Sequence, residues 1–206
     1  MLNRAAFLFR GQLSFLLKFR GEKMIQSFLQ SMVAYCLILS PLYILFRFMK
    51  MRKLPKCTIR ETSMFLFFLY CVSIFSQTII PKFTMMDRNI EIYFERTYVS
   101  SNFVPFETIS LYVNQLQGPL AEIAFYNLAG NIILFVPFGV FIPFLWHKMN
   151  GPFKMLIVAL AIPLFIEGTQ YFIGRSVDVD DVILNTTAIY IGYICYAAIA
   201  KFMSPK

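Results

Sequence analysis

The chain has 206 residues, of which 58% are hydrophobic and 24 are phenylalanine, and it carries a formal net charge of +8. Soluble domains contain roughly 45 to 50% apolar residues, so this composition and a mean hydropathy of +0.64 indicate a protein surrounded by lipid. The basic residues are spread over the segments that flank apolar runs. Their distribution favours lipid headgroups as partners and excludes nucleic acid.

The amino-terminal segment, residues 1–23, is basic and amphipathic. At about 100° per residue, one stripe of residues 2–19 collects most of its polar and basic side chains. The members of this stripe are Asn3, Arg4, Arg10, Gly11, Ser14 and Lys18. The pattern predicts an amphipathic helix that lies along the membrane interface.

Five apolar runs follow, each near the ~20 residues that a helix needs to cross ~30 Å of hydrocarbon. They cover residues 25–48, 64–80, 123–145, 155–173 and 182–200. Only helices and closed barrels satisfy their backbone groups in lipid, and these runs lack the period-two alternation of barrel strands. The predicted fold class is therefore an all-α membrane protein, a polytopic bundle of about five transmembrane helices.

The apolar runs and the basic segments divide the chain into three predicted parts. The amphipathic segment 1–23 comes first, an extra first span with a basic loop occupies residues 24–61, and a four-span core with an external loop at 81–122 occupies residues 62–206. The basic loop suggests that residues 47–61 face the cytoplasm, although the basic amino terminus makes the charge count nearly even. Aromatic and acidic residues in the external loop predict a packed cap.

Cysteine and histidine chemistry is not indicated. The four cysteines show no C-x-x-C spacing, and His147 is the only histidine, next to Trp146 in a short basic loop. We expect neither a disulfide framework nor a histidine-based zinc site.

The third span carries the string Asn127-x-x-Gly130-Asn131-x-x-x-Phe135-x-Pro137-Phe138-Gly139. Asn127 and Asn131 are one turn apart, so both carboxamides face the same way. Gly130 is expected to permit close helix approach. The alternative is that both asparagines only form hydrogen bonds between helices.

The fourth span ends in Glu167-x-x-Gln170, and an acidic string follows it. Ionisable groups at membrane depth are costly, so a cluster of them marks a functional site by default. Helical spacing aligns the members of each segment on one face, at a similar depth in the outer leaflet. The predicted ligand-binding or functional cluster consists of Asn127, Asn131, Glu167, Gln170, Arg175, Asp178, Asp181 and Asn185.

A structural role is the alternative for part of this string. Arg175 and Asp178 have the spacing of a salt bridge, and Asp180 lies off the shared face, where a role at a helix terminus is favoured. No catalytic residue and no cofactor is identified. A divalent cation, if one binds, would take oxygen ligands from Glu167, Asp178 and Asp181.

Four motifs in this order resemble the VanZ-like family, which is named for a teicoplanin-resistance protein. They are Asn-Phe-x-Pro-Phe at 102–106, N-x-x-G-N-x-x-x-F-x-P-F-G at 127–139, E-x-x-Q at 167–170 and R-x-x-D-x-x-D-x-x-x-N at 175–185. The resemblance covers about residues 64–200. Ala188 departs from it, because the family usually has glycine there.

The resemblance implies a multi-pass protein of the bacterial plasma membrane with the acidic string outside. It favours a protein that binds or shields at the outer leaflet, linked to glycopeptide or lipoglycopeptide resistance, with a lipid-linked wall precursor or a glycopeptide as ligand. Two alternatives remain: a membrane enzyme acting on a lipid-linked or phosphate-bearing envelope substrate, and a small transporter that uses Glu167. The oligomeric state is not predicted.

Overall fold

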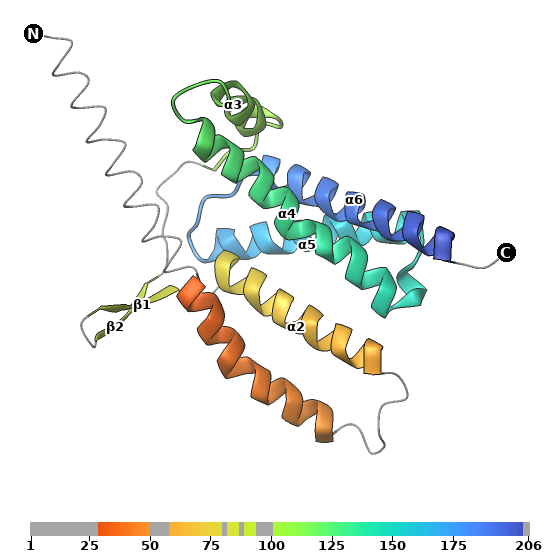
Figure 1. Cartoon of the computed structure of the whole chain (residues 1–206). Helices are drawn as coiled ribbons and strands as arrows, with labels where there is room; N and C mark the ends of the chain where they lie inside the picture. Colours follow the sequence, from red (N-terminus) through yellow and green to blue (C-terminus); the bar gives the residue numbers. More distant parts are fainter. Residues whose placement is uncertain (1–28, 50–57, 80–81, 87–88, 94–100, 204–206) are drawn as a thin grey trace, which may run out of the picture. The chain divides into compact units, whose positions relative to one another are not determined.

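The computed structural model describes residues 29–49, 58–79, 82–86, 89–93 and 101–203. Within them, five helices are long and apolar enough to cross a bilayer (Figure 1). These are Leu29–Met49, Ile59–Thr78, Ala121–Leu145, Pro152–Phe172 and Val179–Phe202. The predicted all-α membrane fold is confirmed. The predicted interfacial helix at residues 1–23 lies outside the described residues.

The chain divides into two compact units. The first consists of residues 1–53 and 69–95. In it, the helix Leu29–Met49 contacts the second half of α2 (Thr58–Thr78) through Cys36, whose Sγ lies 3.6 Å from Ser73 Oγ. Ser31 and Ser76 are fully buried.

An antiparallel hairpin in this unit was not predicted. Strand β1 (Lys82–Met86) pairs with β2 (Asn89–Tyr93), with Lys82 opposite Tyr93 and Met86 opposite Asn89. Ile90 and Ile92 alternate with polar residues along β2, which is a period-two pattern. From its sequence, this stretch was expected only to be part of the external loop at 81–122.

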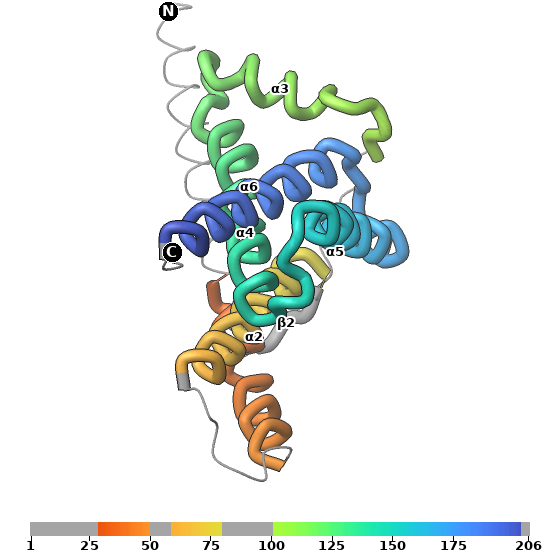
Figure 2. Tube along the Cα trace, turned by 90° about the vertical axis from the view of Figure 1, so that its right-hand side faces the viewer, coloured from red at the N-terminus to blue at the C-terminus, as the bar shows by residue number. Residues whose placement is uncertain are grey.

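The second unit consists of residues 54–68 and 96–206 and contains the predicted site. Its main elements are α3 (Glu107–Gln115), α4 (Ala121–Leu145), the short 3₁₀ helix η1 (His147–Met149), α5 (Pro152–Phe172) and α6 (Val179–Met203). Helix α6 packs extensively on α4 and also on α5, whereas α4 and α5 barely touch. Figure 2 shows α6 crossing α4, with α3 near the ends where both helices begin.

Two glycines set the distance between α4 and α6. A Cβ atom on Gly139 would overlap the backbone of Ile189 and Tyr193, and one on Gly192 would overlap the carbonyl of Val136. Only glycine allows backbones to approach this closely. At Gly130, where close approach was predicted, a Cβ atom would have no neighbour within 4 Å, so that prediction is wrong.

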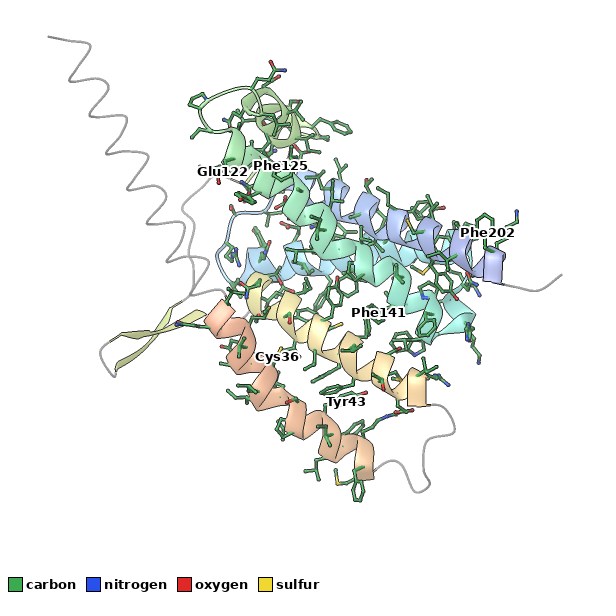
Figure 3. All side chains as sticks on the ribbon, in the orientation of Figure 1. Cys36, Tyr43, Glu122, Phe125, Phe141 and Phe202 are labelled. Atoms are coloured by element: carbon green, nitrogen blue, oxygen red, sulfur yellow. The ribbon has the colours of Figure 1, made fainter. Side chains whose placement is uncertain are left out.

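Other contacts tie the remaining helices to this pair. The Thr186 hydroxyl of α6 donates a hydrogen bond to the Ala159 carbonyl of α5 at 3.1 Å. The ring of Phe67, in the first half of α2, lies 5.5 Å from Phe141 and 5.7 Å from Trp146 by centroid distance. Phe141, labelled in Figure 3, belongs to α4. The first half of α2 is thereby packed against the far end of α4.

Candidate functional site

The segment before α3 and the segment before α6 pair with each other. The Asn102 N–H donates to the Val177 carbonyl at 2.9 Å, and the Val179 N–H donates to the Asn102 carbonyl at 3.0 Å. These bonds form a short parallel bridge between Asn102 and Asp178. Residues separated by more than seventy positions in sequence therefore meet where α6 begins.

Asp178 caps α6 and also binds the other segment. One carboxylate oxygen accepts the Asp180 N–H at 2.9 Å, as an N-cap side chain does. The same oxygen lies 3.2 Å from the Asn102 amide nitrogen, and the second oxygen accepts the Thr108 hydroxyl at 2.7 Å. Both Asp178 oxygens are thus occupied by donors of the protein.

Asp180 stabilises the start of a different helix, α3. Its carboxylate is fully buried and accepts the backbone N–H of Phe106 and, at 3.0 Å, that of Ile109. Phe106, which precedes α3, adopts a left-handed conformation with φ 67° and provides no side-chain cap of its own. Asp180 thereby accepts hydrogen bonds from backbone N–H groups at the start of α3, which have no acceptor within the helix. The structural role favoured for Asp180 agrees with these contacts.

A glycine turn brings the acidic string back toward α5. Gly174 has φ 77°, the Arg175 N–H donates to the Gln170 carbonyl at 3.0 Å, and the Gly174 N–H donates to the Tyr171 carbonyl at 3.2 Å. This pair of bonds is a Schellman motif, which ends α5. The chain then reverses, and the Asp178 N–H donates to the Glu167 carboxylate at 3.2 Å.

Helix α4 reaches the cluster through Asn131. Its amide nitrogen donates to Asp181 at 2.8 Å, so one of the two predicted asparagines binds the acidic string. Asn185 follows Asp181 by one turn and precedes Ile189 by one turn, and the Ile189 carbonyl lies against Gly139 of α4. Asn185 therefore faces α4 between these two contacts.

Asn185 is 5% exposed, and its buried Oδ1 has no hydrogen-bond partner among the described residues. A buried carbonyl oxygen without a donor costs about 1 to 3 kcal/mol, so such groups call for a specific explanation. Glu167 is also 5% exposed and accepts only the Asp178 N–H within the described part of the chain. The interior side of the cluster is therefore rich in acceptors.

The sequence model of the VanZ/LLP1 family matches residues 65–201. The chain belongs to the VanZ/LLP1 family. No curated protein and no solved structure matches the chain significantly. The region matched to the VanZ/LLP1 family includes every residue of the network around Asp178 and Asp181.

The structure brings four of the predicted residues into this hydrogen-bond network: Asn131, Glu167, Asp178 and Asp181. Asn127 is exposed and donates to the Ile123 carbonyl of its own helix at 2.9 Å. Gln170 is 9% exposed, and Arg175 is half-buried in the turn that follows it. The joint membership of all eight residues in one binding site stays a prediction.

Two further residues of the network were not predicted as site residues. Asn102 and Thr108 both bind Asp178 and also bind each other, with 3.0 Å between the Asn102 amide nitrogen and the Thr108 hydroxyl. Asn102 belongs to the Asn-Phe-x-Pro-Phe motif that carries part of the resemblance to the VanZ/LLP1 family. The sequence signal that could have identified Asn102 as a site residue is its place inside this motif, just before a short helix.

Tyr112 brings a phenol to the same region. Burial raises its pKa, and the negative charges of Asp181 and Asp178 raise it further. The neutral phenol is therefore the favoured form. Tyr112 lies one turn after Thr108, so one side of α3 faces the acidic cluster.

Metal binding gains no support from the arrangement of the side chains. In the described residues, no group of three or more His, Cys, Asp or Glu side chains is placed to hold a metal ion. Asp178, one of the three predicted cation ligands, already accepts donors at both oxygens. A divalent cation on Glu167, Asp178 and Asp181 remains a prediction from sequence.

Proposed function

We propose that this membrane protein of the VanZ/LLP1 family binds a donor-rich envelope ligand at the membrane face where α4 and α6 begin. The ligand class is a peptide or glycopeptide that carries amide and ammonium groups, either a lipid-linked wall precursor or a lipid-tailed glycopeptide antibiotic. Binding there would shield the precursor or retain the antibiotic, and so lower antibiotic susceptibility. The plasma membrane of a bacterium is the proposed location.

The observation that carries the proposal is the excess of hydrogen-bond acceptors at the cluster. The Asn185 Oδ1 is buried without a partner among the described residues, and the nearby carboxylate of Asp181 accepts the Asn131 amide at one oxygen. Carbonyl and carboxylate oxygens accept hydrogen bonds from N–H donors, so a ligand that carries ammonium or amide groups would suit them. Asp178 and Asp180, in contrast, are satisfied by the protein and support the geometry of the region.

The first experiment compares antibiotic susceptibility of bacteria with and without the protein. We expect expression to reduce susceptibility to lipid-tailed glycopeptides, and Asp181→Asn, Glu167→Gln and Asn185→Leu to remove most of this effect at unchanged membrane levels. Asn127→Ala is the matched control, because Asn127 bonds only its own helix in the described structure. Full retention of the effect in all three cluster variants would contradict the proposed site.

The second experiment separates binding from catalysis. Wall precursors and lipids extracted from cells with and without the protein should have the same masses if the protein only binds. Calorimetric titration of the purified protein in lipid nanodiscs with a lipid-tailed glycopeptide measures binding directly. A new precursor or lipid product would replace the binding function with the enzyme alternative.

A further inference from the structure

Helix α3 has three sides with different surroundings. The side carrying Thr108 and Tyr112 faces the acidic cluster. A second side continues along the helix and its flanking residues with the spacing i, i+3, i+7 and i+10, and it is entirely apolar: Phe106, Ile109, Val113 and Leu116. The third side is polar and exposed, with Glu107, Ser110 and Asn114.

The apolar side is largely uncovered. Phe106 is 59% exposed, Val113 50% and Leu116 39%, and Phe103 and Val104 just before the helix are exposed as well. Glu107 carries the only formal charge between Ser101 and Leu120. An exposed apolar stripe beside an exposed polar stripe is typical of a helix lying in a membrane interface. Leu111 is exposed on the opposite flank and does not belong to the stripe.

The position of both ends keeps α3 at the surface of the bilayer. The segment starts at Asn102, which is bridged to Asp178 at the beginning of α6, and ends where α4 begins at Ala121. Two spans that begin at one membrane face therefore hold both ends of the segment at that level. Figure 2 shows α3 near these two helix ends.

Within the same unit, α3 packs against α4, a span with exposed apolar side chains. Phe125, labelled in Figure 3, is 58% exposed in the second turn of α4, and Ile133 is 70% exposed further along. Apolar side chains of a span are exposed because lipid covers them. Lipid would account in the same way for the exposed stripe of α3, a helix that packs against this span.

We propose that the stripe Phe106, Ile109, Val113 and Leu116 is inserted into the boundary between headgroups and acyl chains of the bilayer. Helix α3 then lies in the membrane interface, with its polar stripe toward the headgroups and Thr108 toward the acidic cluster. The proposed occupant of this surface is lipid, and the inference does not depend on the ligand proposed above.

A single tryptophan reports the surroundings of each stripe. The natural Trp146 is first replaced by phenylalanine, which keeps a ring beside Phe67. Val113→Trp then places the reporter on the apolar stripe, and Asn114→Trp, one residue later, is the matched control on the polar stripe. The full-length protein is reconstituted in phosphatidylcholine and phosphatidylglycerol vesicles, with or without bromine on the acyl chains.

We expect brominated chains to quench Val113→Trp at least about twofold more than Asn114→Trp, and aqueous iodide to show the opposite order. Phe106→Trp is a second reporter on the stripe and should behave like Val113→Trp, which keeps the test valid if one variant does not fold. Iodide quenching of both stripe reporters would show that the stripe faces water. Protection from both quenchers that disappears on dilution into more lipid would show that a second copy covers it. Either result overturns the proposal.

Discussion

Asp178 and Asp180 are two residues apart, yet they stabilise different helices. Asp178 caps α6 and fixes Asn102 and Thr108, whereas Asp180 accepts two backbone N–H groups of the first turn of α3. Both carboxylates serve the architecture, so removal of either changes the frame around the cluster. Asp181, bound by Asn131, is the member of this string that we assign to ligand binding.

Asp180→Ala should destabilise the protein by about 2 kcal/mol, because it removes a helix cap and leaves two N–H groups without acceptors. The midpoint of thermal unfolding in detergent, followed by the fluorescence of Trp146, measures the change. Glu122→Ala is the control, since Glu122 is an exposed acid in the first turn of α4 (Figure 3). Equal midpoints for Asp180→Ala and the wild type would show that this cap contributes nothing.

Tyr112 makes stability depend on alkaline pH. Its pKa in the folded protein is raised above the ordinary value of 10.0, because burial and the charges of Asp181 and Asp178 disfavour the phenolate. The folded protein therefore holds this proton more tightly than the unfolded chain does. Ionisation of Tyr112 therefore leaves the free energy of unfolding unchanged at pH values below the pKa of this tyrosine in the unfolded chain. It lowers the free energy of unfolding as the pH rises above that pKa.

We expect Tyr112→Phe to remove this component of the pH dependence. Unfolding midpoints of the variant and the wild type, measured from about pH 8 to about pH 11, should differ by a constant amount up to the unfolded pKa, and above it the wild type should lose stability relative to the variant. The subtraction cancels the other tyrosines and the lysines, because both proteins share them. Parallel curves over the whole range would contradict the assignment.

At the scale of helices, the crossing of α4 and α6 depends on Gly139 and Gly192. The third-span motif contains both Gly130 and Gly139, and sequence spacing alone did not separate their roles. Gly139 lies on the turns of α4 that meet α6, while nothing lies within 4 Å of a side chain added to Gly130. Ala188 is fully buried in α6, so this helix remains closely packed where the family usually has glycine.

Gly139→Ala and Gly192→Ala should each lower stability by about 2 kcal/mol or more, because a methyl group would push two backbones apart. Gly130→Ala is the matched control in the same helix and should be neutral or stabilising by up to about 1 kcal/mol. Unfolding midpoints in detergent and the yield of monodisperse protein measure both effects. A loss of stability in Gly130→Ala equal to that in Gly139→Ala would contradict this packing of α4 on α6.

At the scale of the whole molecule, the orientation in the membrane gives a direct test. We predict that α3 faces the outside and that the η1 loop faces the cytoplasm, as the family orientation implies. In a cysteine-free background, Asn114→Cys should react with an impermeant thiol reagent in intact cells and Lys148→Cys only after lysis; both positions are exposed. Labelling of Lys148→Cys in intact cells, with no reaction at Asn114→Cys, would invert the orientation and move the proposed site to the cytoplasm.

The sequence by itself determined the membrane class, the five apolar helices and the family. These are local properties, because a run of about twenty apolar residues specifies a span whatever it packs against. Motif order was enough for the VanZ/LLP1 assignment, which the match over residues 65–201 confirmed. Helical spacing also placed Asp181 and Asn185 on one face of α6, since periodicity assigns residues to a face.

Only the tertiary structure decided which partner each face meets. Asn131 binds Asp181, while Asn127, one turn earlier, turns back to its own helix. Asp180 reaches the start of α3, which is more than seventy residues away in sequence. Periodicity predicts the direction of a side chain on its helix, but the crossing of α4 and α6 and the pairing of Asn102 with Asp178 determine what lies in that direction.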